Sequence, residues 1–230
     1  MLFSRKIKKT ISIVRGIGKP KIFCISFQRT GTTSTGEFFR RNGYSVAGYS
    51  QSRKNDWTLK WFSGNFEAIF NSLDFKTTQV FEDDPWWCLD FYKFLFHRFP
   101  TSTFVLMERD GDNWFDSMVS HSHGKSLGNA YRHSRIYRRE KEFYDGYYNG
   151  NKYSREVDNL MPLNESYRQH YKDIYELRNR EVKEFFDSFG KERLYIGKLE
   201  DDEKWVKMGD FFDIKVDRHF DVHVNKSSKK

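Results

Sequence analysis

Short apolar runs alternate with longer amphipathic stretches along the chain. Runs bounded by turn-forming or polar residues predict strands at residues 21–26, 44–46, 79–81, 103–107 and 193–197. Stretches with apolar positions at helical spacing predict helices at residues 33–41, 57–73, 86–99, 113–120, 163–189 and 204–212. Alternating strands and helices are typical of a parallel sheet covered on both faces. The sequence therefore predicts an α/β fold in which helices flank a parallel sheet.

Residues 122–162 interrupt this alternation, because they show no clear hydrophobic period. Between Lys125 and Arg155 the chain holds eight basic and three acidic side chains, interleaved with six tyrosines. Long insertions of this kind are usually functional lids or disordered segments. Two interpretations stay open: an irregular or helical lid that binds a polar or anionic ligand such as a sugar, and a flexible surface excursion.

The positive charge is concentrated at the start of the chain. Of the 40 Lys and Arg side chains, seven lie in residues 1–21, where no acidic residue occurs, so the rest of the chain is close to neutral. That balance argues against a nucleic-acid partner. Phe3, Ile7, Ile11 and Val14 fall on one helical face among these cations. Residues 1–18 are therefore either a solvated tail or a peripheral contact with an anionic membrane surface.

The sequence shows no sign of export or membrane insertion. No apolar stretch approaches the roughly 18 residues of a spanning helix, and no apolar core of a secretory signal is present. We expect a cytoplasmic protein with a basic extension at residues 1–20 and one domain over residues 21–230. Cys24 and Cys88 lie in apolar runs, which favours buried thiols over a disulfide. We expect no metal, since no His, Cys or carboxylate cluster has metal-ligand spacing.

A candidate phosphate site follows the first predicted strand. Gly31 lets the backbone approach an anion closely, and Thr32, Thr33 and Ser34 add hydroxyl groups at the start of a helix. Nucleoside-triphosphatase loops carry a lysine at the position of Thr32, whereas here the cation lies upstream at Arg29. A small-metabolite kinase that needs Mg²⁺ stays an alternative, which this substitution disfavours.

Three adjacent carboxylates follow the third predicted strand. Glu82, Asp83 and Asp84 lie at the carboxyl end of that strand, the edge at which open α/β sheets bind ligands. Adjacent carboxylates raise one another's pKa, which suits a general base. The alternative is that this run only caps a helix beginning at Trp86. His121 and His123 are weaker candidates for the base.

The phosphate site resembles the 5′-phosphosulfate loop of the sulfotransferase superfamily, P-[KR]-[ST]-G-[ST]-[ST]. Residues 29–33 match it as Arg-Thr-Gly-Thr-Thr, with Gln28 where proline is common. A second segment is similar to the superfamily's 3′-phosphate motif: a strand ending at Arg109 and Asp110, with Ser117 eight residues after the arginine. Asp110 itself is predicted to start a helix.

Further segments are similar to one branch of this superfamily. Trp114 fills a tryptophan position between the arginine and the serine, and Asp84 matches the aspartate of an aspartate–proline segment. The stretch from Trp205 to Asn225 resembles the branch's terminal pattern, with Ile214 and Asp221 as departures. The resemblance covers most of the chain. It implies a P-loop-like parallel sheet flanked by helices.

The resemblance implies 3′-phosphoadenosine 5′-phosphosulfate (PAPS) as the sulfuryl donor and a hydroxyl or amine of an acceptor, a small molecule or a glycan or glycolipid. Arg29 would neutralise charge on the bridging oxygen, and one of the three carboxylates would act as base. The donor would be held by Arg29, Thr30, Gly31, Thr32, Thr33, Ser34, Arg109, Ser117 and Lys226. A non-catalytic module that binds an anionic glycan stays open as a further alternative.

Overall fold

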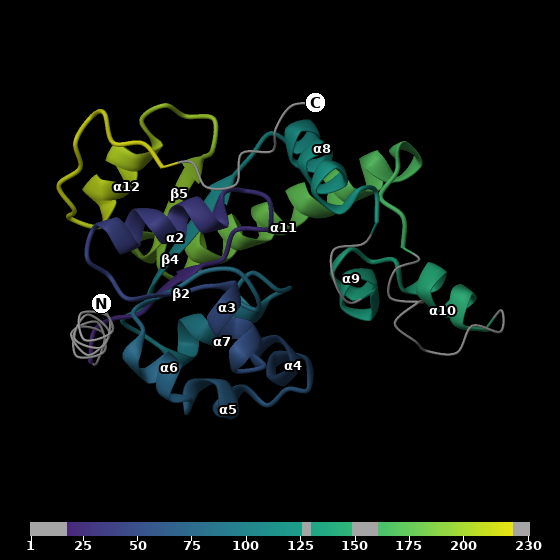
Figure 1. Ribbon diagram of the computed structural model, residues 1–230, viewed down its shortest axis with the longest axis horizontal. Helices are drawn as coiled ribbons and strands as arrows, with labels where there is room; N and C mark the ends of the chain where they lie inside the picture. The colour runs from purple at the N-terminus through teal and green to yellow at the C-terminus, as the bar shows by residue number, and fades with distance from the viewer. Residues whose placement is uncertain (1–17, 126–129, 149–160, 223–230) are drawn as a thin grey trace, which may run out of the picture. The chain divides into compact units, whose positions relative to one another are not determined.

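A computed structural model describes residues 18–125, 130–148 and 161–222 of the chain (Figure 1). The predicted leader helix and Lys226 lie outside these residues. The chain divides into two compact units, one made of residues 1–108 and 185–225 and the other of residues 109–184 and 226–230. Each unit is described by itself below. The expectation of one domain over residues 21–230 stays a prediction.

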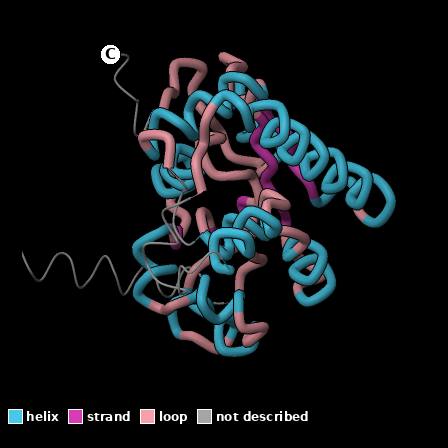
Figure 2. Tube along the Cα trace, turned by 90° about the vertical axis from the view of Figure 1, so that its right-hand side faces the viewer, coloured by secondary structure: helices cyan, strands magenta, loops and turns pink. Residues whose placement is uncertain are grey.

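The first unit contains a five-stranded parallel sheet with the strand order β2-β3-β1-β4-β5. Its strands are β1 (Ile22–Cys24), β2 (Val46–Ala47), β3 (Val80–Phe81), β4 (Thr103–Glu108) and β5 (Leu194–Lys198). Figure 2 shows the strands side by side with helices around them. The α/β class with a parallel sheet is confirmed, and all five strands lie within about two residues of their predicted places.

The strand register brings two predicted site segments to one edge of this sheet. Phe23 of β1 pairs with Phe81 of β3 on one side and Phe104 of β4 on the other. Because β1 and β3 are parallel and in step, their carboxyl ends point the same way. The loop after β1 and the carboxylates after β3 are therefore neighbours.

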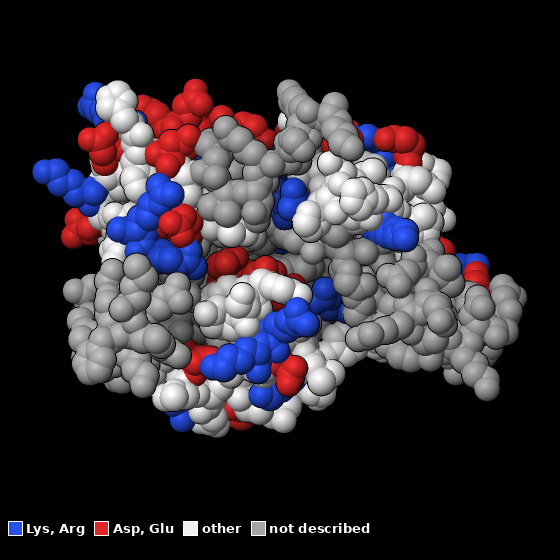
Figure 3. Space-filling view, viewed as in Figure 1, with Lys and Arg blue, Asp and Glu red and all other residues white. Residues whose placement is uncertain are grey.

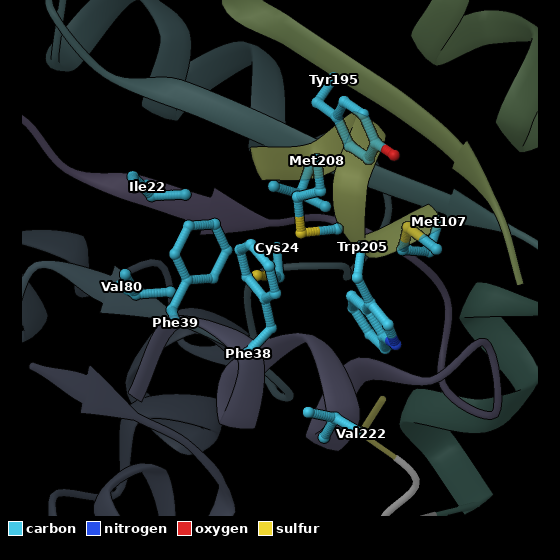
Figure 4. Close-up of a cluster of buried hydrophobic side chains, with 11 residues drawn as sticks. Ile22, Cys24, Phe38, Phe39, Val80, Met107, Tyr195, Trp205, Met208 and Val222 are labelled. Atoms are coloured by element: carbon cyan, nitrogen blue, oxygen red, sulfur yellow. The ribbon is translucent and has the colours of Figure 1, made fainter. Parts of the chain in front are cut away.

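Two layers of helices cover the sheet. Helices α2 (Thr32–Arg41) and α12 (Lys204–Phe211) pack on one face, where Phe38 and Trp205 stack at 5.5 Å over Cys24 and the neighbouring strand residues (Figure 4). The other face is aromatic: the Phe23 ring lies 5.4 Å from both Phe81 and Trp86. This alternation of Phe23 and Cys24 between the faces follows from the two-residue period of a strand.

The remaining helices of this unit are short. They are α3 (Tyr49–Lys54), α4 (Trp57–Phe62), α5 (Phe66–Phe70), α6 (Leu73–Thr77), α7 (Phe91–Arg98) and the 3-10 turn Lys191–Arg193. The single helix predicted over residues 57–73 is wrong. Asn65 and Ser72 start new helices there by accepting hydrogen bonds from the backbone N–H groups of Ala68 and Phe75.

The second unit is helical. It contains α8 (Gly111–Ser122), α9 (Ala130–Ile136), α10 (Glu140–Tyr148), a 3-10 turn (Glu165–Tyr167) and most of α11 (Arg168–Phe189). The predicted insertion thus forms two helices within its described part, and Phe143 and Met161 are buried there against Tyr131. These three side chains form a small core within the described part of the insertion, and its role as a lid stays a prediction.

Charge on the first unit gathers by sign. Figure 3 shows acidic side chains over α12, where Asp202, Glu203 and Asp210 are exposed. Within the described residues, no helix is both long enough and apolar enough to cross a membrane.

Arg193 directly precedes β5 and contacts the end of α7 and the turn before β4, at the opposite end of the sheet from the candidate site. Its guanidinium donates to the carbonyls of Ser102 and Phe99, each at 2.8 Å, and lies 3.8 Å from the Phe96 ring. We expect Arg193→Ala to lower the free energy of unfolding by about 2 kcal/mol, because two carbonyls lose a charged donor. Urea unfolding checks this. Arg193→Lys should recover only part of the loss, since an ammonium lacks the planar fork; an unchanged midpoint in Arg193→Ala would contradict the assignment.

Candidate functional site

The loop after β1 is anchored at both ends. Ser26 accepts a hydrogen bond from the Met107 backbone N–H at 2.6 Å and donates to the Val105 carbonyl at 3.3 Å, which fixes the end of β1 to β4. Thr30 is fully buried, and its hydroxyl donates to the Phe27 carbonyl. The Thr30 side chain therefore stabilises the loop from within.

The backbone of the loop is shaped to bind an anion. Arg29 and Gly31 both have left-handed conformations, with φ of 68° and 82°. Gly31 lies so close to Leu199 that a Cβ there would come within 2.7 Å of its Cδ1. Left-handed residues in a loop turn successive N–H groups toward one concavity, which suits phosphate or sulfate.

The start of α2 adds to this anion site. Gly31 is the N-cap residue, and the first helical hydrogen bond runs from the Thr35 N–H to the Gly31 carbonyl at 2.9 Å. The N–H groups of the first turn have no carbonyl partner within a helix, and the helix dipole is positive at this end. The first turn contains no acidic residue that would compete for these donors. Thr32 and Thr33 are half-buried, whereas Ser34 is buried.

Glu82 occupies a notch made by two glycines. The side chain is only 5% exposed. A Cβ on Gly36 of α2 would lie 2.9 Å from Glu82 Cγ, and one on Gly48 would lie 2.0 Å from Oε1. Oε2 has no hydrogen-bond partner among the described residues. Burial, followed by the charge of Asp83, raises the pKa of Glu82 to about 8.

Asp83 and Asp84 lie at the same sheet edge and are half-buried. Asp83 is left-handed at φ 73°, and its Oδ1 accepts from the Asp84 backbone N–H at 2.8 Å. The next helix, α7, begins only at Phe91 with Asp90 as its N-cap. The expectation of a helix starting at Trp86 is thus wrong, and with it the idea that these acids cap that helix.

The second unit holds the other predicted site residues. Arg109 directly follows β4, and the Asp110 side chain caps α8 by accepting from the Asn113 N–H at 3.0 Å, as predicted. Ser117 is buried one turn after Trp114 on α8. The Tyr175 hydroxyl accepts from the Arg109 N–H at 2.8 Å and donates to the Arg109 carbonyl at 3.1 Å.

A protein-family model described as a sulfotransferase domain matches residues 21–229. The chain belongs to the sulfotransferase family. Among solved structures, a sulfotransferase from Alicyclobacillus acidocaldarius aligns with a TM-score of 0.46 and 14% identity, covering 93% of this chain and 87% of that one. A comparison with curated proteins found no match. The family implies that this sulfotransferase is an enzyme that uses PAPS.

The predicted site residues of the sulfotransferase fall into two groups. Arg29, its loop and the three carboxylates belong to the first unit, and Arg109 and Ser117 belong to the second. His121 and His123 are exposed at the end of α8, where His123 is the C-cap residue. Lys226 lies outside the described residues.

The second unit of the sulfotransferase also contains a buried cluster of polar side chains that was not predicted from the sequence. His133 Nε2 lies 2.5 Å from the Tyr171 hydroxyl, which accepts from Arg139 at 3.0 Å. Burial, then the charge of Arg139, lowers the pKa of His133 to about 3, and burial raises the pKa of Tyr171 to about 12. The cluster fixes α9 to α11 with a neutral histidine.

Proposed function

We propose that this sulfotransferase transfers a sulfuryl group from PAPS to a hydroxyl or amine of a glycan or glycolipid. The observation that carries the proposal is the loop after β1, with left-handed Arg29 and Gly31 leading into the acid-free start of α2. This arrangement presents backbone N–H groups, the positive end of a helix dipole and one cation to a single anionic group.

The loop residues fit the phosphosulfate end of the donor. The backbone N–H groups from Gly31 to Ser34, with the hydroxyls of Thr32 and Thr33, would hold the 5′-phosphate. Arg29 would stabilise the negative charge that develops on the bridging oxygen as its bond to sulfur breaks. Little covalent work is required of the protein in such a transfer, so positioning and charge stabilisation supply the rate.

Arg109 and Ser117 would hold the 3′-phosphate of the donor, with Lys226 as a further cation. A guanidinium can bind two phosphate oxygens at once, which suits this task better than an ammonium. The support is local: Arg109 lies directly before α8, and Ser117 lies two turns along the same helix.

The carboxylates after β3 would take the proton that the acceptor loses when its oxygen or nitrogen bonds to sulfur. Asp83 and Asp84 are more exposed than Glu82. Glu82 is buried under α2, and with its pKa raised to about 8 it holds its own proton at neutral pH. Glu82 would therefore act as base only in alkaline solution, whereas an aspartate base needs no such condition.

The acceptor class rests on the exposed side chains of the lid helices. Arg135 on α9, Arg138 between the two helices and Lys141 on α10 are exposed, and Tyr144 on α10 is 47% exposed. Cations together with an exposed aromatic ring suit a glycan that carries anionic groups.

Calorimetric titration without metal tests the donor assignment. The ligands are the product nucleotide 3′-phosphoadenosine 5′-phosphate (PAP), adenosine 5′-phosphate (AMP) and adenosine triphosphate. We expect PAP to bind much more tightly than AMP. A metal-dependent preference for the triphosphate would support a kinase instead, and PAP binding without any sulfuryl transfer would support a non-catalytic module.

Arg109→Ala should weaken PAP binding selectively. The loss of one charged hydrogen-bonding partner is expected to cost roughly 1.5–3 kcal/mol of PAP binding and little of AMP binding. Titration of both nucleotides measures the difference. Arg135→Ala removes an exposed arginine of the same unit and should leave the ratio unchanged; equal weakening of both nucleotides by Arg109→Ala would contradict a role at the 3′-phosphate.

A further inference from the structure

The backbone of Arg109 has an unusual pair of hydrogen-bond partners. One tyrosine hydroxyl, that of Tyr175, serves both its N–H, at 2.8 Å, and its carbonyl, at 3.1 Å. A hydroxyl has one proton to donate and lone pairs to accept, so the two bonds are compatible. A single side chain thus fixes both polar groups of the Arg109 backbone.

The two hydrogen bonds from Tyr175 lie directly after the last residue pair of the β4–β5 ladder. The β4–β5 ladder ends at Glu108, paired with Lys198, and the Glu108 carbonyl accepts from the Leu199 N–H at 2.8 Å. Arg109 is the next residue, beyond the last pair. Without the Tyr175 hydroxyl, its N–H and carbonyl would lose these two hydrogen bonds.

The Tyr175 ring is itself held rigidly. It stacks on Trp114 with ring centroids 4.4 Å apart and planes 12° from parallel, and both rings are buried. Around this stack α8 and α11 run antiparallel, joined by Lys172 to Asp112 at 2.7 Å and by Phe115 against Tyr171. The hydroxyl therefore has a fixed place relative to the start of α8.

We propose that Tyr175 is a positioning residue that aims Arg109 at the 3′-phosphate of the donor, with Trp114 as the platform for its ring. The inference rests on the proposed function of Arg109. It assigns the selectivity for a 3′-phosphorylated nucleotide to a hydroxyl 66 residues away in sequence. It also gives the tryptophan between the arginine and the serine a physical task.

Tyr175→Phe tests this, because phenylalanine keeps the stacked ring and removes only the hydroxyl. We expect PAP affinity to fall about tenfold while AMP affinity stays unchanged, since two hydrogen bonds that orient Arg109 are lost. Tyr171→Phe is the matched control. It removes another buried hydroxyl one turn earlier on the same helix, and that hydroxyl bonds to His133 and Arg139 instead.

The ratio of PAP to AMP affinity separates a positioning role from a merely structural one. The same ratio in Tyr175→Phe as in the unmodified protein, or an equal fall in Tyr171→Phe, would overturn the proposal. Should Tyr175→Phe not fold, Trp114→Phe loosens the platform and is expected to lower the ratio in the same direction; an unchanged ratio there would overturn it too. If the unmodified protein does not prefer PAP to AMP, the proposed function itself fails.

Discussion

Replacing Arg29 by alanine is expected to lower the turnover number by about 10²–10³-fold, the usual cost of removing one group that stabilises developing charge. Nucleotide binding should weaken much less. In the proposed site the backbone N–H groups and the start of α2 would still bind the 5′-phosphate, and these do not depend on the Arg29 side chain. Alanine is a fair probe of the guanidinium because neither residue is favoured at the φ of 68° found here.

Release of PAP from PAPS, with and without an oligosaccharide acceptor, measures the turnover, and titration with PAP measures binding. Arg29→Lys should retain part of the rate, since a cation remains. Arg40→Ala is the matched control. Arg40 lies on α2 but is exposed and paired with Glu37, so its loss should leave turnover intact. Turnover unchanged in Arg29→Ala, or binding lost together with turnover, would contradict the role given to Arg29.

The sheet could be predicted from the sequence because its strands are buried on both faces. A run such as Thr103–Met107 is apolar without interruption, which distinguishes it from an amphipathic helix. Helix boundaries were harder. Residues 57–73 are apolar enough at helical spacing to predict one helix, yet the local bonds of Asn65 and Ser72 break it into three. Helix caps depend on hydrogen bonds of single side chains, and the spacing of apolar residues gives no information about these bonds.

The same contrast holds for the candidate site. Arg29, Gly31 and Thr32 are consecutive or nearly so, and a local motif contains the information that places them. Tyr175 could not be found in this way, because it lies within a long amphipathic helix and meets Arg109 only through the packing of α8 against α11. The one available signal was the four-residue spacing of Tyr171 and Tyr175, which predicts that both rings share a buried face.

The contact of two glycines with Glu82 could not be predicted from the sequence either. Gly36 lies in a helix and Gly48 after a strand, and only the fold brings both against one carboxyl group. A buried carboxyl without a hydrogen-bond partner costs stability, and two neighbouring positions are restricted to glycine to make room for it.

Glu82→Gln should therefore stabilise the first unit in alkaline solution. In the folded protein the pKa of Glu82 is raised from 4.5 to about 8, so folding keeps a proton that the unfolded chain releases. A group with a raised folded pKa contributes stability that is fully present below the unfolded pKa and is lost as the pH rises through the folded pKa. Between about pH 4.5 and 8 this loss amounts to about 5 kcal/mol, at 1.36 kcal/mol per pKa unit. Glutamine has the same shape and no charge. The stability of Glu82→Gln should therefore change little with pH over this range, so its slope of stability against pH should be close to zero.

Hydrogen exchange of the β1, β3 and α2 amides as a function of pH measures the stability of this unit directly. Glu37→Gln is the matched control on α2: the pKa of Glu37 is lowered by its hydrogen bonds to Arg40 and Arg41, so it stays ionised over this range and its replacement should leave the slope intact. A slope in Glu82→Gln equal to that of the unmodified protein would show that Glu82 is ionised throughout. Activity then separates the carboxylates. If Glu82→Gln retains turnover and its pH profile, Glu82 is not the base, and Asp83 and Asp84 stay the leading candidates.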